Sequence, residues 1–145
     1  MTHTAYRTDF YAWTKQQAAL LEAEEWEKLD IPNIKEEIES MGRSQRKEVK
    51  SRLLILLLHL LKWQYQPHKN KGNSWRSTIR TQRNEIEIEL SDSPSLRREV
   101  PDFVEYVYLR ARKGAAEETG LALSTFPVDC PWTVAEIVDE DWLPV

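Results

Sequence analysis

Apolar residues recur along most of the chain at intervals of three and four positions, the spacing that gathers side chains on one face of an α-helix. The first such pattern follows Thr8 and Asp9, and both are good N-cap residues. We therefore expect the first helix to begin there, with an apolar face that consists of Phe10, Trp13, Leu20 and Leu21.

A second apolar stripe follows Asp30, which can cap a helix, and includes Pro32, which suits a first helical turn. Its apolar members are Ile31, Ile34, Ile38 and Met41. Gly42 is suited to end this helix, and Ser44 could then cap a third helix that reaches about Gln66. Alternatively, the two segments form one rod with a kink at Gly42.

The rest of the chain is also predicted to be helical. Helical spacing continues through residues 74–90, so the alternating stretch EIEIEL within them is not assigned to a strand. Further helices are expected to start near Pro94, near Pro101 and, with a capping box, at Thr133. Residues 1–145 are therefore predicted to form a single-domain, all-α bundle of about five to seven helices around a long, largely buried central helix.

The central helix contains the most apolar run of the chain, Leu53–Leu61, and this run is interrupted by His59. At about 100° per residue, His59 falls inside a narrow polar arc rather than among the leucines. The polar members of this arc are Gln45, Glu48, Arg52, His59, Lys62 and Gln66, and Ile55 interrupts it. Because an unpaired buried polar group costs about 1–3 kcal/mol, the stripe must meet solvent or polar neighbours. The acidic helix around residues 36–39 is the nearest candidate.

Charge is segregated along the chain, although the net charge is only −4. Residues 43–83 hold eleven bases and one acid, whereas residues 22–41 hold eight acids and two bases. Residues 129–145 hold five acids and no base. These blocks either neutralise one another within the fold or leave a basic face for an anionic partner.

His59 is the candidate centre of a catalytic site. Together with Glu36, Glu37 or Glu39 it could supply the acid–base chemistry of a hydrolase or nuclease, with nearby arginines holding phosphate. Metal chemistry is not indicated, because position 56 is leucine and the Glu-x-x-His spacing of helical carboxylate sites is absent. We therefore predict no metal and no cofactor.

The basic block also contains candidates for nucleic-acid binding, since aromatic rings stack on bases and cations contact phosphates. These candidates are Lys62, Trp63, Trp75, Arg76, Arg80 and Arg83. The pI of about 5.5 and the core-like spacing of the tryptophans argue against this function. Nucleic acid is therefore a partner that we do not favour.

The chain shows no sign of a membrane segment. The apolar run Leu53–Leu61 is shorter than the roughly 20 residues that span a bilayer. The first ten residues carry no apolar signal region. Cys130 is the only cysteine, which excludes an intrachain disulfide and fits a reducing compartment. A cytoplasmic protein without membrane contact is expected.

Several sequence motifs follow one another in a familiar order: FYAWTKQQAALL, LDIPNIKEEIESMGRSQR, LLLHLLKWQYQP, SWRSTIRTQRNEI, DSPSLR, AAEETGL and CPWTVAEIVDEDWLP. In this order the chain resembles, over nearly its whole length, a bacterial family common in cyanobacteria and known as domain-of-unknown-function family 29. The resemblance implies a small all-α protein and implies no activity. The positions that match the family include Glu36, Glu37, Glu39, His59, Lys62, Trp63, Trp75 and Glu118.

The leading hypothesis for function is a non-catalytic interaction or regulatory module whose partner is a protein, either another chain or a second copy of this one. The alternative is a hydrolase or nuclease centred on His59, which requires that histidine to lie in a cleft within hydrogen-bond reach of a carboxylate. Nucleic-acid binding through residues 43–83 is the third hypothesis.

Overall fold

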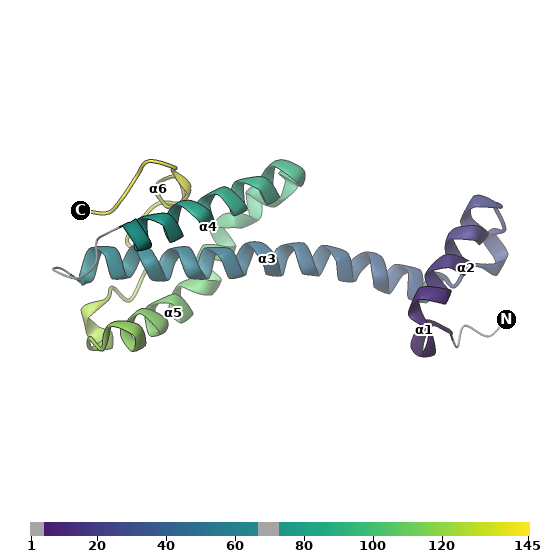
Figure 1. Cartoon of the computed structure of the whole chain (residues 1–145), viewed down its shortest axis with the longest axis horizontal. Helices are drawn as coiled ribbons and strands as arrows, with labels where there is room; N and C mark the ends of the chain where they lie inside the picture. The colour runs from purple at the N-terminus through teal and green to yellow at the C-terminus, as the bar shows by residue number, and fades with distance from the viewer. Residues whose placement is uncertain (1–4, 67–72) are drawn as a thin grey trace. The chain divides into compact units, whose positions relative to one another are not determined.

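The computed structural model describes residues 5–66 and 73–145, and all regular structure in these ranges is helical (Figure 1). The α-helices are α1 (Ala5–Thr8), α2 (Phe10–Glu22), α3 (Ile31–Tyr65), α4 (Asn73–Asp92), α5 (Val100–Thr119) and α6 (Val134–Val138). Short 3₁₀ helices are η1 (Trp26–Lys28), η2 (Pro94–Glu99) and η3 (Leu123–Thr125). The predicted all-α class with a long central helix is confirmed.

The chain divides into two compact units, Met1–Ser44 and Gln45–Val145, and α3 begins in the first and ends in the second. The first unit is organised around the buried carboxylate of Asp30. Trp13 Nε1 donates to Asp30 Oδ2 over 2.9 Å, and the backbone N–H of Asp30 donates to Gln17 Oε1 over 2.8 Å. Asn33 in the first turn of α3 donates to the same carboxylate over 2.7 Å. These hydrogen bonds position α2 against the start of α3.

The first unit has a small apolar core. Within its described residues, Trp13 and Leu20 are the buried apolar side chains. The rings of Tyr6 and Phe10 pack beside Trp13, with their centroids 4.7 and 5.5 Å from it. The buried contacts described for this unit thus centre on one polar network and one aromatic cluster.

α3 is one continuous helix from Ile31 to Tyr65. Of the two alternatives for residues 31–66, the structure therefore shows a single rod, and Gly42 does not end a helix. Gly42 lies inside this helix, and a Cβ built at that position meets no atom within 4 Å. The glycine is thus not required for packing in the described part of the chain, although glycine destabilises a helix interior by about 0.5–1 kcal/mol relative to alanine. Side chains of α3 from Met41 to Lys47 are exposed, and deep burial starts at Val49.

The second unit has a leucine core. Figure 1 shows the second half of α3 lying between α4 and α5. The fully buried leucines of α3 are Leu53, Leu56, Leu57, Leu60 and Leu61. Buried side chains of α4 and α5 join the same cluster, among them Ile79, Ile86, Leu90, Phe103 and Val107. α5 approaches closely at Gly114, where an added Cβ would lie 2.7 Å from Leu58 Cδ1.

Polar residues of the α3 stripe form hydrogen bonds with other residues of this second unit. Gln45 Nε2 donates to Ser93 Oγ over 2.7 Å, and Arg52 Nη1 lies 3.4 Å from Gln82 Oε1 on α4. The partners of the stripe therefore include residues after α4 and on α4, whereas the sequence pointed to the acidic residues 36–39 as the nearest candidate.

The C-terminal segment is attached to the bundle by buried side chains. Ile137 of α6 is fully buried, and Trp132 Nε1 donates to Gln64 Oε1 on α3 over 3.1 Å. The predicted capping box is present, with Glu136 N donating to Thr133 Oγ1 and Thr133 N to Glu136 Oε1. Within the described ranges, no helix is both long and apolar enough to cross a membrane.

Two glycines of similar exposure offer a test of this helix geometry. Gly42→Ala is expected to raise the free energy of unfolding by about 0.5–1 kcal/mol, because alanine fits a helix interior with open space around its Cβ. Gly120→Ala is the matched control, since Gly120 ends α5 with φ of 74° and alanine is strained there. Denaturant unfolding checks both variants, and a loss of stability in Gly42→Ala would contradict the expectation.

Candidate functional site

His59 lies on the partly buried side of α3, with its hydrogen bond directed into its own helix. Its Nδ1 lies 2.9 Å from the backbone oxygen of Ile55, so Nδ1 carries the proton and donates, which leaves Nε2 as the basic atom. Burial lowers the pKa of His59 below its usual 6.5, and the positive charge of Lys62 acts in the same direction. Glu118 opposes both effects. A neutral imidazole is therefore the stable form at neutral pH.

Lys62 of α3 contacts residues of both α4 and α5 at this point. Its side chain is only 11% exposed, and Nζ lies 3.2 Å from Glu118 Oε1 on α5. The same ammonium lies 4.9 Å from the centroid of the Trp75 ring on α4. A cation held by both a carboxylate and an aromatic face has little freedom to contact a ligand.

The tryptophans proposed as stacking platforms are covered. Trp63 is buried, and the guanidinium of Arg76 lies 5.4 Å from the centroid of its ring. Trp75 is half-buried beneath Lys62. Each of these rings therefore already has a cation from the protein on it, in the position where a nucleic-acid base would stack.

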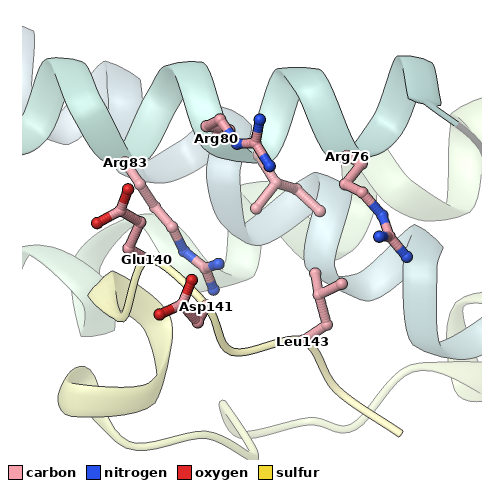
Figure 2. Close-up of a pocket in the computed structure, with 7 residues that line it drawn as sticks. Arg76, Arg80, Arg83, Glu140, Asp141 and Leu143 are labelled. Atoms are coloured by element: carbon pink, nitrogen blue, oxygen red, sulfur yellow. The ribbon is translucent and has the colours of Figure 1, made fainter.

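The three arginines of α4 line one small cavity of about 170 Å³ together with residues of the C-terminal segment. Figure 2 shows Arg76 and Arg83 extending from α4 toward the segment that carries Glu140, Asp141 and Leu143. Arg83 is only 5% exposed, and its Nε donates to the backbone oxygen of Ile137 over 2.8 Å. The structure thus brings the predicted arginines together but assigns Arg83 to an internal contact.

The charge balance of this cavity is mixed. Burial lowers the pKa of Arg83, and the carboxylates of Asp139 and Asp141 oppose that shift. Arg80 is exposed and has no hydrogen-bond or ion-pair partner in the described part of the chain. The α4 wall of the cavity carries cations, and the opposite wall, formed by the C-terminal segment, carries the carboxylates of Glu140 and Asp141. The cavity is therefore not a simple phosphate site.

The three glutamates proposed as partners of His59 belong to the first unit and have partners there. The Tyr6 hydroxyl donates to Glu37 Oε1 over 2.6 Å. Glu36 lies 2.7 Å from Arg43 Nη2 and Glu39 lies 3.3 Å from Lys35 Nζ. The predicted catalytic set is thus divided between the two units, and its histidine makes its hydrogen bond to a carbonyl of its own helix.

Sequence reasoning did not identify the network around Asp30 or the internal role of Arg83. The sequence around Asp30 indicates only a helix cap, whereas its carboxylate also accepts a hydrogen bond from Trp13, 17 residues earlier in the chain. The available signal was the pair Trp13 and Gln17, whose four-residue spacing places both on one helix face. For Arg83 no local signal exists, because its partner oxygen lies 54 residues along the chain.

No group of three or more His, Cys, Asp and Glu side chains within residues 5–66 and 73–145 could hold a metal ion. Compared with known proteins, residues 5–143 match one family model, described as domain of unknown function DUF29. No curated protein and no solved structure matches the chain.

The contact of Arg83 with α6 can be tested against its neighbour on the same helix. Arg83→Ala is expected to lower the free energy of unfolding by about 1–3 kcal/mol, because a buried carbonyl oxygen loses its donor. Arg80→Ala is expected to change it by less than about 0.5 kcal/mol, since Arg80 is an exposed residue without such a contact. Urea unfolding of both variants measures the difference, and equal effects would contradict the assigned role.

The lowered pKa of His59 predicts a pH dependence of stability. The unfolded chain binds this proton more tightly than the folded chain, so the stability that the neutral ring contributes is present above about pH 6.5. It is lost as the pH falls from about 6.5 to the lower pKa of the folded chain. His59→Leu is expected to fold normally and to lose less stability than the wild type between about pH 7 and pH 5. Thermal melts across this range test it, and an unchanged pH profile would contradict it.

Proposed function

Because the chain belongs to the DUF29 family, whose description assigns no function, we propose from the structure that this protein is a non-catalytic interaction module. Its first unit associates with a second copy of the same chain. The observation that carries the proposal is an exposed apolar stripe at the start of α3, made of Ile31, Ile34, Ile38 and Met41.

The stripe has the spacing of a helix seam. Its members are three, four and three residues apart, which is the pattern of the contact positions in a coiled coil. Ile31, Ile38 and Met41 are exposed and Ile34 is half-buried. Contiguous apolar surface of this kind is typical of a binding site.

The same spacing continues along α3, but the character of the stripe changes after Met41. The next position is Gln45, which already has a partner in Ser93. Farther along, Arg52 and Lys62 also have partners within the second unit. The polar part of the stripe is therefore paired within the second unit, and the apolar part belongs to the first unit.

α2 supports the proposal with exposed apolar residues of its own. Phe10 and Leu21 are both exposed and lie eleven residues apart, on one face of the helix. Two helices that each leave an apolar stripe uncovered form half of a bundle, since a helix must bury its apolar face against another element. A second, identical pair of helices would complete a four-helix arrangement.

A second copy is the partner that this stripe fits best. A stripe of evenly spaced apolar residues is complementary to itself, as an isologous interface requires. The charges beside it are paired within the same helix, Lys35 with Glu39 and Arg43 with Glu36. Both signs are thus present next to the seam, so each of these two glutamates already has a cation beside it.

The energies allow a dimer of moderate affinity. Full burial of an isoleucine or methionine side chain contributes roughly 1.5–3 kcal/mol. Three such side chains from each copy, already partly covered, would contribute about 6–12 kcal/mol, against an association cost of about 4–15 kcal/mol. The α3 stripe alone would therefore give weak association, and the exposed residues of α2 are needed for a stable dimer.

The geometry around His59 favours a non-catalytic role. The hydrogen bond of its ring goes to the carbonyl oxygen of Ile55, and Lys62 beside it is held by Glu118 and Trp75. General acid–base catalysis needs a histidine whose second nitrogen is oriented by a carboxylate or carbonyl and whose first reaches substrate. Among the described residues, no carboxylate is hydrogen-bonded to the His59 ring.

Association through the stripe can be tested with two exposed isoleucines. Ile38, which is 59% exposed, lies in the stripe, whereas Ile88, which is 53% exposed, lies on α4 in the second unit. The wild type and Ile88→Lys are expected to sediment as dimers at micromolar concentration, and Ile38→Lys as a monomer, because a charge in the seam is desolvated on association. Circular dichroism checks that both variants are folded.

A wild type that stays monomeric over the whole accessible concentration range would overturn the proposal. So would a dimer that Ile38→Lys leaves intact or that Ile88→Lys disrupts equally.

A further inference from the structure

The second unit carries an apolar groove that neither the proposed dimer nor the residues around His59 use. It has a volume of about 400 Å³ and lies between α5 and the loop that follows η3. Val104 and Tyr108 of α5 are buried and form its floor. Leu109 and Val128 form its rim and are 56% and 66% exposed.

Hydrogen bonds between α5 and the loop fix the position of the loop beside the groove. The Tyr108 hydroxyl donates to the backbone oxygen of Pro127 over 2.7 Å, and Arg112 Nε donates to the backbone oxygen of Phe126 over 3.0 Å. The Phe126 side chain is buried in the core. Because these hydrogen bonds are made within the protein, the groove is preformed and little has to be ordered when a ligand binds.

Two carboxylates are the charged groups of the groove. Glu105 projects from α5 and Asp129 from the loop, and both side chains belong to exposed residues. Neither has a hydrogen-bond or ion-pair partner among residues 5–66 and 73–145. Among the described residues, no basic side chain lines the groove. Its complement is therefore an apolar group accompanied by a positive charge.

We propose that this groove binds a cationic, amphipathic segment of a protein partner, with an apolar side chain between Leu109 and Val128 and a lysine or arginine against Glu105 and Asp129. Small-molecule sites usually enclose most of their ligand. Here the apolar rim is open to solvent, which suits a chain that lies along the groove. Recognition of this kind uses an apolar anchor for affinity and the charge pair for specificity.

Cys130 lines the groove and is the only cysteine of the chain, so its reactivity reports on this site alone. Burial raises the pKa of the Cys130 thiol, and its Sγ lies 3.7 Å from the backbone oxygen of Trp132. A thiol reagent at about pH 8.5 will therefore react slowly but measurably with the full-length protein. A segment seated in the groove covers the thiol and slows the reaction further.

The experiment compares two synthetic helical peptides of equal length, one of leucine and lysine and one of leucine and glutamate. The leucine–lysine peptide is expected to slow modification of Cys130 at least about fivefold at saturation, and the leucine–glutamate peptide to leave the rate unchanged. Glu105→Lys and Leu109→Asp are each expected to weaken this protection about tenfold or more, which corresponds to about 1.4 kcal/mol. Glu117→Lys is the matched control, because Glu117 is exposed on the same helix but lies outside the groove.

Protection by both peptides alike, or by neither, would overturn the proposal, as would equal effects of Glu105→Lys and Glu117→Lys. The Ile38→Lys variant separates this site from the dimer. It is expected to retain full protection of Cys130, and loss of protection in that variant would refute an independent groove.

Discussion

Burial of the leucines of α3 is the constraint on which the second unit depends. Complete burial of five such side chains contributes roughly 8–15 kcal/mol, which is as large as the net stability of a typical domain. A helix with leucines around most of its circumference must be covered on several sides, and α4, α5 and the C-terminal segment provide that cover. The polar stripe then has to be paired by the same covering elements. Lys62 is an example of this pairing, since its ammonium contacts Glu118 on α5 and the Trp75 ring on α4.

Local features of the fold were predictable and distant pairings were not. Asp9, Gly120 and the Thr133 capping box act within a few residues, so their roles follow from sequence. Gly42 left two alternatives open, because its helix penalty of about 1 kcal/mol is too small to decide whether a helix ends. The partner of Lys62 could not be read from periodicity, since Glu118 lies 56 residues away and its position depends on how α5 packs.

The sequence also selected the candidate site residues as a group, whereas the contacts that each of them makes could not be predicted from it. The fold brings together several of the cations and aromatic rings that the sequence selected as binding candidates, but three of the cations make contacts within the protein. Arg76 covers Trp63, Lys62 covers Trp75, and Arg83 donates to the backbone near α6. Cations that are paired within the bundle are less available to bind a partner. The two surfaces proposed for binding are accordingly an isoleucine stripe and a leucine–valine groove.

The unequal burial along α3 has a consequence for its dynamics. Amide hydrogen exchange of a helix depends on the free energy needed to open it locally, which follows the side-chain contacts that opening would break. From Val49 onward, opening α3 would expose the leucine core, whereas from Met41 to Lys47 it would expose little that is not already in water. A single uninterrupted helix therefore contains a steep gradient of protection. We expect amides from Met41 to Lys47 to exchange readily, and those of the last turns to exchange only when the whole second unit unfolds.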